Sequence, residues 1–403
     1  MSQAIHEPAI RTDGDLAGTG VLTPGRASAI AMISVAAGLM AIGAVMTFST
    51  SARVDRALVG WEFWNYPAVR QMAFVIGGLL AMLVLSQISY RIWSAWNGLP
   101  ALLFLLVALG LSALVLVPGI GVEVNQARRW LQIGPASWGL RFQPSELIKV
   151  ALPVFLAGWT VNIRAFRRGF LPVVLMIGAA VGIVGIEDFG TGVLLAAVGG
   201  AMLLMAGARW WHVGLLVLPS VPAFAYLLLS RSHRMERLLT FLDIYKDPEG
   251  KGYQAVQSLC TIASGGWWGR GLGRGFVKGY LPEARTDFIF AVVCEELGIV
   301  GAAAVIGLLI VLMWQAFKVI RDCRDPMGRL LVFGIAWTIG LQAAMNIAVV
   351  TVSVPTKGIA LPLVSAGGSG AIFLGALVGV MASIARFGVP ACPGLAAPRR
   401  MSD

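Results

Sequence analysis

The feature that most constrains this chain is a series of long apolar segments. Ten stretches of mostly hydrophobic residues recur along its 403 residues, and a helix needs about 20 such residues to cross a bilayer. Only 13% of the residues are charged, whereas a soluble domain carries about 25%. The pattern predicts an all-α integral membrane protein with about ten transmembrane helices. The expected spans are 27–48, 72–88, 99–117, 146–161, 170–186, 191–207, 211–229, 288–317, 329–352 and 369–388.

The segments outside these spans divide the chain into one membrane domain and two tails. Residues 1–26 are polar with Pro, Gly and Thr, residues 389–403 have a similar character, and both are predicted to be disordered tails. The polytopic membrane domain occupies 27–388. Its largest loop, 230–287, separates the seventh and eighth spans. An even number of spans places both termini on one side of the membrane.

The distribution of positive charge predicts the orientation and the kind of partner. Lys and Arg in the short loops favour a cytoplasmic N-terminus, which makes both tails cytoplasmic and the large loop extracytoplasmic. That loop is itself basic, against the usual rule. The net charge of +11 is scattered between apolar runs, so anionic head groups or pyrophosphates are expected rather than nucleic acid. The four cysteines and three histidines show no metal-ligand spacing, and no metal site is predicted.

One carboxylate lies where the large loop meets the eighth span. Asp287 follows Glu283 and Arg285 and precedes the apolar run that begins at Phe288. Thr286 and Asp287 are residue types that cap helix N-termini, so a plain helix cap accounts for the local pattern. The alternative is chemistry, because a carboxylate at the bilayer edge is placed to act on a lipid-linked substrate.

The loop before the fourth span carries a second set of polar residues. Arg128 lies beside an interfacial tryptophan. Pro144 predicts the first turn of a helix capped near Gln143. Lys149 follows Glu146 by three residues, within reach of an ion pair. A structural pair and a functional intramembrane charge are both compatible with this spacing.

A very short turn separates the fifth and sixth spans. It contains Asp188 and, three residues later, Thr191. This spacing favours a structural role for Asp188 as a helix cap.

A glycine-rich stretch, S-G-G-W-W-G-R-G-L-G-R-G, occupies 264–275 of the large loop. Its spacing does not match a dinucleotide-binding fingerprint, and no βαβ unit surrounds it. Backbone N–H groups together with Arg270 and Arg274 could cradle a pyrophosphate. A flexible solvated loop explains the composition equally well.

The last polar region interrupts the apolar sequence near the C-terminus. It comprises Asn346 and the segment V-P-T-K-G-I-A-L-P-L-V-S-A-G-G-S-G at 354–370. Irregular backbone at membrane depth is tolerated where it is buried in protein or lines a cavity. Lys357 and Ser365 are therefore expected to face a cavity.

Several of these segments together resemble the SEDS family (shape, elongation, division and sporulation), and its FtsW branch more closely than its RodA branch. The resemblance covers roughly 27–388. The matching segments occur in family order: N-Q-A-R-R-W-L, F-Q-P-S-E-L-I-K, D-F-G-T, G-Y-Q-A-V-Q-S-L, G-G-W-W-G-R-G-L-G, L-P-E-A-R-T-D-F-I-F-A-V-V-C-E-E-L-G and P-T-K-G-I-A-L-P-L-V-S-A-G-G-S. The departures, at Gln126, Ala284-Arg285 and Gly370, remove no carboxylate or lysine.

The resemblance implies a ten-span peptidoglycan glycosyltransferase. Such enzymes polymerise lipid II on the outer membrane face and work with a class B penicillin-binding transpeptidase. A role in septal wall synthesis, and contact with other division proteins, follow from the FtsW likeness. The family's essential aspartate falls on Asp287, the expected general base. No cofactor is implied with certainty, and a divalent cation is possible.

The polar residues then divide into two expected roles. Candidates for holding the pyrophosphate of lipid II are Arg128, Lys149, Arg270, Arg274, Lys357 and Ser365. Expected structural residues are Gln143, Glu146, Asp188, Glu283, Glu295, Glu296 and Asn346. Glu295 and Glu296 lie about 12–14 Å along the helix from Asp287 at 1.5 Å per residue. That separation is too large for a shared reaction centre.

Two rival functions use the same features. A transporter that flips lipid II explains the spans and a polar cavity. It does not need Asp287 at the outer edge, and the sequence has no evident inverted repeat. A scaffold that only recruits division proteins leaves the intramembrane charges unexplained.

Overall fold

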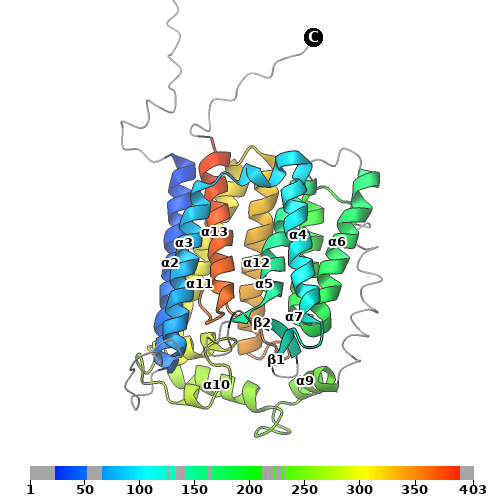
Figure 1. Cartoon of the computed structure of the whole chain (residues 1–403). Coiled ribbons are helices and arrows are strands. Elements are labelled where there is room, and N and C mark those ends of the chain that lie inside the picture. The colour runs from blue at the N-terminus through cyan, green and yellow to red at the C-terminus, as the bar shows by residue number, and fades with distance from the viewer. Residues whose placement is uncertain are drawn as a thin grey trace, which may run out of the picture.

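The computed structural model forms a bundle of long helices capped at one end by smaller elements (Figure 1). The structure describes residues 23–51, 66–124, 127–132, 134, 141–160, 166–210, 214, 222, 229 and 232–390. The bundle helices are α2 (Pro24–Ser51), α3 (Pro67–Gln87), α4 (Ala95–Val115), α5 (Pro144–Thr160), α6 (Phe166–Glu187), α7 (Phe189–Met205), α11 (Ile289–Asp322), α12 (Pro326–Val350) and α13 (Ser369–Gly388). A short 3₁₀ helix, η2 (Tyr90–Ser94), precedes α4.

Each of these helices coincides with a predicted span, and the remaining span, 211–229, lies almost wholly outside the described residues. Among the residues that the structure describes, six helical segments are long and apolar enough to cross a membrane: α2, α3, η2 with α4, α11, α12 and α13. The protein is therefore a mostly helical, multi-pass membrane protein. Helix α2 begins, and α13 ends, at the end of the bundle opposite α9 and α10 (Figure 1).

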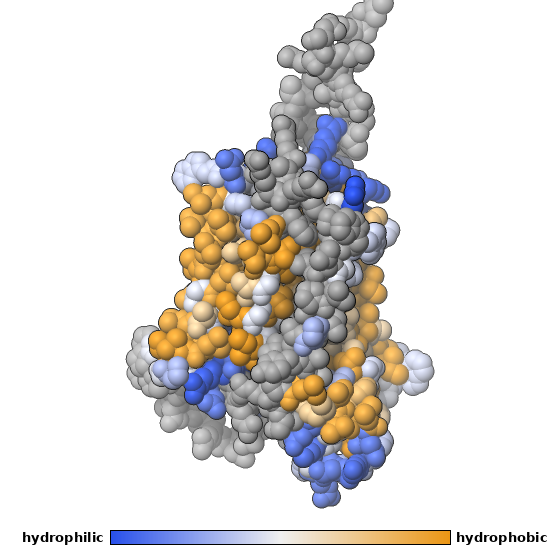
Figure 2. All heavy atoms as spheres, turned by 90° about the vertical axis from the view of Figure 1, so that its right-hand side faces the viewer, coloured by the Kyte–Doolittle hydropathy of each residue, from blue (hydrophilic) through white to orange (hydrophobic). Residues whose placement is uncertain are grey.

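Burial separates central helices from lipid-facing ones. In α13, 72% of the most apolar window is buried, against 22% in α3. Large apolar side chains such as Leu80 of α3 and Ile310 of α11 are exposed. Figure 2 shows such hydrophobic surface along one side of the bundle. In water this surface would favour aggregation, whereas in a bilayer it is the surface that contacts lipid.

Small residues allow α3 and α13 to pack closely. A Cβ added to Gly375 would lie 2.3 Å from the carbonyl oxygen of Gly78, and one on Gly78 would lie 2.7 Å from that of Ala371. Without a hydrophobic driving force between helices in lipid, such close contact supplies the packing energy. The core of the bundle therefore depends on glycine at this crossing.

The loop between α4 and α5 departs from the all-α expectation. It contains β1 (Gly121–Val124), β2 (Ala127–Gln132) and β3 (Arg141–Phe142), which form an antiparallel sheet in the order β1-β2-β3. Only two residues of sequence separate β1 from β2, and the paired strands satisfy each other's backbone groups. The all-α prediction is confirmed for the helical bundle and wrong for this loop, and the expected number of ten spans stays a prediction.

The large loop contains two helices and is attached to a break in α11. These helices are α9 (Ser232–Leu242) and α10 (Tyr253–Gly265), and a 3₁₀ turn, η4 (Val277–Gly279), follows. Helix α11 is interrupted at Gly298, whose φ is +69°.

The loop backbone supplies the hydrogen bonds that the interrupted helix lacks. The N–H groups of Arg270 and Gly271 donate to the carbonyls of Glu295 and Glu296 at 2.9 and 3.0 Å. In return, the N–H of Ile299 donates to the carbonyl of Gly266 at 3.0 Å. The glycine-rich stretch is therefore an ordered part of the helix interface.

Candidate active site

A cavity of about 1040 Å³ opens at the end of the bundle that carries the sheet and α9. Its walls come from β2, α5, α7, α9, α12, α13 and the segments 283–288 and 354–367. Of the residues predicted for the site, those that line it are Gln143, Glu146, Lys149, Asp188, Glu283, Asp287, Lys357 and Ser365. Arg128, Arg270, Arg274, Glu295, Glu296 and Asn346 are not among its lining residues.

Asp287 lies at the wall of this cavity and does not cap α11. The helix begins at Ile289, its N-cap position is Phe288, and no side-chain cap is formed there. Within the described part of the chain, the Asp287 carboxylate has no hydrogen bond or ion pair. The structure thus does not support the helix-cap alternative.

The environment of Asp287 favours its neutral form. Its side chain is half-buried, and burial raises the pKa of the carboxyl to about 7, with Glu283 and Asp188 adding negative charge nearby. Arg129 and Arg237 act in the opposite direction. A carboxylate with this pKa can accept and release a proton near neutral pH.

The backbone around Asp287 is held by residues far away in the sequence. Ser365 Oγ donates to the carbonyl of Thr286 at 2.6 Å, and Asn346 Nδ2 donates to that of Asp287 at 2.7 Å. Gly358 lies directly against the carboxylate, since a Cβ there would be 2.7 Å from Asp287 Oδ2. Ser365 was predicted to bind substrate, but its hydroxyl already donates to this loop.

Lys357 lines the same cavity as Asp287. Its Nζ lies 4.0 Å from the centroid of the Phe189 ring, a cation–π contact. Its side chain packs against Gly190, where a Cβ would come within 2.9 Å of Lys357 Cδ. The cation predicted to face a cavity does so.

Asp188 has the predicted capping role. Its carboxylate accepts the N–H of Thr191 at 3.2 Å and the Thr191 hydroxyl at 3.0 Å. Burial acts to raise the pKa of this carboxyl, but the positive charges of Arg129 and Lys357 outweigh it and bring the pKa below its ordinary value. The cavity therefore contains one aspartate held ionised and another poised near neutrality.

Lys149 forms the predicted local pair. Helix α5 begins at Pro144, as predicted, and Lys149 Nζ lies 2.6 Å from Glu146 Oε1. It also donates to Gln342 Oε1 at 3.0 Å. Gln143 Nε2 donates to Ser145 Oγ at 3.0 Å. The structural and the functional interpretation of Lys149 are both partly supported, because this lysine is paired with Glu146 and also lines the cavity.

The glycine-rich stretch does not form the predicted pyrophosphate cradle. Beyond the N–H groups that bind α11, those of Phe276 and Lys278 donate to the Glu295 carboxylate at 2.8 and 3.0 Å. Arg270 Nε donates to the carbonyl of Ser264 at 3.0 Å. These donors are occupied by the protein itself.

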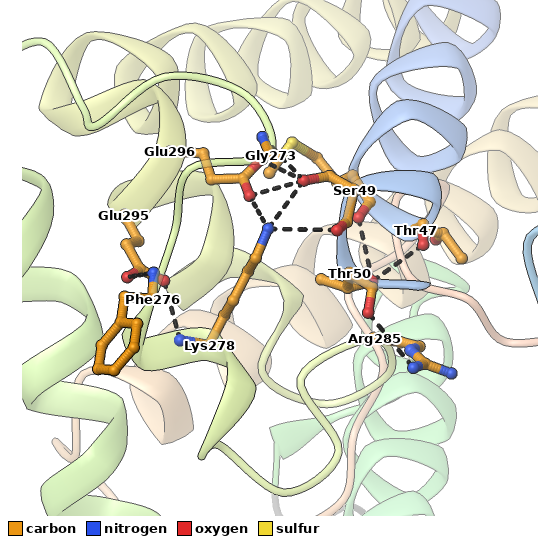
Figure 3. Close-up of polar contacts among 10 residues, drawn as sticks. Thr47, Ser49, Thr50, Gly273, Phe276, Lys278, Arg285, Glu295 and Glu296 are labelled. Carbon is orange, nitrogen blue, oxygen red and sulfur yellow. Dashed lines mark hydrogen bonds and ion pairs between the residues drawn. The ribbon is translucent and has the colours of Figure 1, made fainter. Parts of the chain in front are cut away.

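Glu295 and Glu296 are fully buried, as predicted. Lys278 forms an ion pair with Glu296, and Ser49 of α2 donates to both Glu296 carboxylate oxygens at 2.6 and 2.8 Å. Figure 3 shows these three side chains converging between α2, the loop and α11. We call Ser49, Lys278 and Glu296 the closed cluster.

Local sequence reasoning missed several polar residues of the cavity, among them Arg129, Arg237 and Gln342. Arg129 Nη1 lies 3.6 Å from Asp188 Oδ2, whereas Arg128 Nε turns to Glu123 at 3.3 Å. Adjacent residues of a strand point to opposite faces. Recognising 127–132 as a strand would have predicted that Arg128 and Arg129 point to opposite faces, so that only one of them faces Asp188.

No group of three or more His, Cys, Asp or Glu side chains placed to hold a metal ion occurs in the part of the chain that the structure describes. The charged groups of the cavity are instead mixed in sign.

Comparisons with known proteins place this geometry in context. A family model named for FtsW, RodA and SpoVE, and described as "Cell cycle protein", matches residues 29–388. A probable peptidoglycan glycosyltransferase FtsW of Halomonas elongata is 42% identical over 354 residues, covering 85% of this chain and 86% of the relative. Stage V sporulation protein E of Bacillus subtilis is 35% identical over 360 residues, covering 87% and 94%.

Solved structures agree with the sequence comparisons. A chain from a peptidoglycan synthase complex, which coordinates polymerization and crosslinking, superposes with a TM-score of 0.68 at 30% identity, covering 88% of this chain and 96% of that one. The rod shape determining protein RodA of Thermus thermophilus superposes with a TM-score of 0.64 at 26% identity, covering 89% and 96%. The matches span the whole bundle and the large loop.

Proposed function

This chain belongs to the FtsW/RodA/SpoVE family of cell cycle proteins, and from that membership we propose how it works as a peptidoglycan glycosyltransferase. The enzyme polymerises lipid II into glycan strands in septal wall synthesis. The observation that carries the mechanism is Asp287, a carboxylate without a hydrogen bond or ion pair in the described part of the chain and with a pKa near 7, on the wall of a large cavity.

Asp287 acts as the general base. The 4-hydroxyl oxygen of the acceptor sugar attacks the anomeric carbon of the donor lipid II, while its proton passes to the Asp287 carboxylate. The bond from the anomeric carbon to the pyrophosphate oxygen breaks, and undecaprenyl pyrophosphate leaves with the electron pair. Because the base has a pKa near 7, it then returns the proton to water near neutral pH.

The cations of the cavity favour the departure of the pyrophosphate. Lys357, Arg129 and Arg237 all line the cavity that contains Asp287. Fixed positive charge in a partly dehydrated site stabilises negative charge that develops on a leaving group. Lys149 contributes less, since Glu146 already neutralises it at 2.6 Å.

The remaining walls suit the lipid part of the substrate. Apolar residues of α7, α12 and α13, among them Leu194, Met345 and Leu374, line the same cavity. A substrate with a prenyl tail can keep the tail against such walls while its sugar reaches Asp287. A transporter would use the same walls, but the names of the relatives are those of glycosyltransferases, which favours the enzyme.

The membrane orientation follows from the substrate. Lipid II is polymerised on the outer face of the cytoplasmic membrane, so the cavity end of the bundle, with α9 and α10, lies outside and both termini lie in the cytoplasm. A cysteine at the exposed Glu249, in a cysteine-free chain, should react with an impermeant maleimide in intact cells. Reaction only after permeabilisation would reverse the orientation.

A class B penicillin-binding transpeptidase is the proposed partner, and other division proteins are expected at the same assembly. The support is the superposition on a chain of a synthase complex that couples polymerization to crosslinking. The tails, 1–26 and 389–403, leave the membrane domain on the cytoplasmic side in this proposal and take no part in the chemistry.

The decisive experiment replaces Asp287 with Asn, which is nearly isosteric. Glycan polymerisation from purified lipid II, with the cognate transpeptidase present, should fall below detection, while membrane insertion and thermal unfolding remain those of a folded protein. The matched control is Asp243→Asn in the same loop, outside the cavity-lining residues, which should retain activity. Wild-type polymerisation rates in Asp287→Asn would overturn the assignment of the base.

A further inference from the structure

The peptide units that precede α11 are held by an unusual set of donors. Ordinarily, a segment just before a helix relies on local capping. Here three successive carbonyls, those of Arg285, Thr286 and Asp287, each accept a hydrogen bond from the region between α12 and α13 or from α12 itself. The donors are Ala366 N at 2.9 Å, Ser365 Oγ at 2.6 Å and Asn346 Nδ2 at 2.7 Å.

Two of these donors also bind the segment that carries Lys357. Asn346 Nδ2 donates to the carbonyl of Ile359 at 2.6 Å, and Ser365 Oγ accepts the N–H of Leu361 at 2.7 Å. Each of the two side chains therefore joins the segment of Asp287 to the segment of Lys357. Their bonds span 59 and 79 positions of the sequence.

We propose that Ser365 and Asn346 are positioning residues that hold the Asp287 carboxylate at a fixed place relative to Lys357 through the backbone of both segments. The proposal rests on the function assigned to Asp287 above. It replaces the expectation that Ser365 binds substrate, and it gives the buried Asn346 a specific task.

Burial and bonding separate this role from substrate binding. Asn346 is 0% exposed and is not among the residues lining the cavity, so it cannot touch the substrate. The single hydrogen of the Ser365 hydroxyl is donated to Thr286, and its oxygen accepts from Leu361. Neither side chain has a donor left for a pyrophosphate.

Gly358 completes the arrangement on the other side of the carboxylate. The distance of 2.7 Å between a Cβ at this position and Asp287 Oδ2 leaves no room for a methyl group. The carboxylate is therefore confined between its own fixed backbone and the backbone of residue 358. An aspartate side chain has only two rotatable bonds, so fixing the backbone and one wall determines where its oxygens lie.

Positioning of this kind affects the chemical step more than binding. A displacement of about 1 Å at a reacting group can cost about 100-fold in rate. Removing the Ser365 hydroxyl frees the Thr286 carbonyl, next to Asp287. Ser365→Ala is therefore expected to lower kcat roughly 10- to 100-fold while KM for lipid II stays within about twofold.

The chain offers a matched control for the loss of a buried hydroxyl. Ser383 of α13 is 1% exposed and donates to the carbonyl of Ile88 at 2.6 Å, the same length as the bond from Ser365. Ile88 follows α3 at the end of the bundle away from the cavity. Ser383→Ala should therefore cost similar thermal stability and leave kcat unchanged.

The experiment measures kcat, KM and the unfolding temperature for wild type, Ser365→Ala, Ser383→Ala and Gly358→Ala, each with the cognate transpeptidase. Gly358→Ala keeps every hydrogen bond named above and displaces the carboxylate directly, so it should lower kcat even if Ser365→Ala folds poorly. The proposal is supported if Ser365→Ala and Gly358→Ala lose kcat at unchanged KM while Ser383→Ala does not.

Two other outcomes have distinct meanings. If wild type polymerises, Asp287→Asn does not, and Ser365→Ala and Gly358→Ala keep wild-type kcat per folded molecule, the positioning role is overturned and the proposed function stands. If KM rises instead of kcat falling, Ser365 belongs to substrate binding. If wild type itself fails to polymerise with its transpeptidase, the proposed function fails first.

Discussion

Two groups of charged side chains lie near the N-terminal end of α11, and they are built in opposite ways. In the closed cluster, Glu296 is fully buried and is met by Lys278 and Ser49 (Figure 3). At the cavity, Asp287 is half-buried, with no hydrogen bond or ion pair to its carboxylate among the described residues. In the closed cluster the carboxylate holds segments of the fold together, whereas in the proposed mechanism the Asp287 carboxylate accepts a proton.

The difference lies in how each carboxylate is neutralised. A buried charge must be paired and hydrogen-bonded or else take up a proton. Glu296 follows the first course: its carboxylate joins α11 to Lys278 of η4, 18 positions away in the sequence, and to Ser49 of α2, 247 positions away. Asp287 follows the second, because burial, together with the negative charges of Glu283 and Asp188, raises its pKa to about 7. An incompletely neutralised carboxylate is less favourable for folding but available for proton transfer.

The largest expected effect comes from opening the closed cluster. Glu296→Gln leaves Lys278 buried without its counter-ion, and removing one partner of a buried pair costs about 3–5 kcal/mol. The unfolding temperature in detergent or nanodiscs should fall sharply, while activity per folded molecule is retained. Arg321→Gln, which breaks the exposed pair with Asp322, is the control and should cost less than about 1 kcal/mol.

This prediction also tests the division between the two regions. A Glu296→Gln protein that unfolds like wild type but no longer polymerises glycan would place the closed cluster in the chemistry. The comparison drawn above would then be wrong.

A smaller effect is expected when a cation of the cavity is removed. Lys357→Met takes away a charge placed for pyrophosphate, and a hydrogen bond to a charged group contributes about 1.5–3 kcal/mol. Lipid II binding and polymerisation should weaken roughly 10- to 100-fold. Thermal stability should fall less than in Lys149→Met, because the methionine keeps the packing against Phe189 and Arg129 still faces Asp188.

Lys149→Met is the matched comparison for Lys357→Met. It should lose stability as well as activity, because Glu146 and Gln342 are left without the ammonium group that they bind. If Lys357→Met loses stability while its folded fraction binds and polymerises normally, Lys357 belongs to an internal ion pair.

The next prediction concerns pH. Asp287 must be ionised to accept a proton, so kcat/KM should rise with pH through about 7. For a single titration kcat/KM at about pH 8 is roughly tenfold higher than at about pH 6. A flat profile over this interval, at constant folded fraction, would contradict a base with this pKa.

Stability should move in the opposite direction over the same range. The pKa of Asp287 in the folded protein lies above that of an unfolded aspartate, so the folded state binds more protons between the two values. The stability contributed by this group is therefore present at low pH and is lost as pH rises toward 7. Asp287→Asn should abolish that decline, whereas Glu296→Gln should not.

The smallest expected effect is a change in the electrostatics of the cavity alone. Glu283 is exposed and its negative charge raises the pKa of Asp287. Glu283→Gln keeps an oxygen that can accept the Thr286 hydroxyl, a bond of 2.9 Å in the wild type. The rising limb of the pH–rate profile should shift to lower pH by less than one unit, with unchanged stability. A shift to higher pH would contradict the assigned cause.

Local sequence signals were sufficient for features that depend on neighbours in the chain. The length of the apolar runs predicted the bundle helices. A separation of three positions predicted both the Lys149–Glu146 pair and the Asp188 cap, which binds Thr191. The sheet at 121–142 was missed because its strands are short and separated by little sequence. The wrong arginine was consequently placed in the site.

The remaining features depend on contacts that no local pattern contains. The bonds from Asn346 and Ser365 to the Asp287 segment connect α12 and the chain before α13 to the large loop. The carbonyls of Glu295 and Glu296 occupy the very N–H groups that composition suggested for pyrophosphate. Which donors are free for a ligand is decided by tertiary structure.

The break at Gly298 determines which segments must be exchanged together in a chimera of this protein. Helix α11 is continuous in sequence, but its first nine residues, 289–297, complete their backbone bonding with the loop segment 266–271. They form one unit with the large loop, while the part of α11 after Gly298 belongs to the helical bundle. A chimera that exchanges α11 between relatives must therefore include residues 266–278 as well. Otherwise the start of α11, directly after Asp287, loses the hydrogen bonds that the loop supplies.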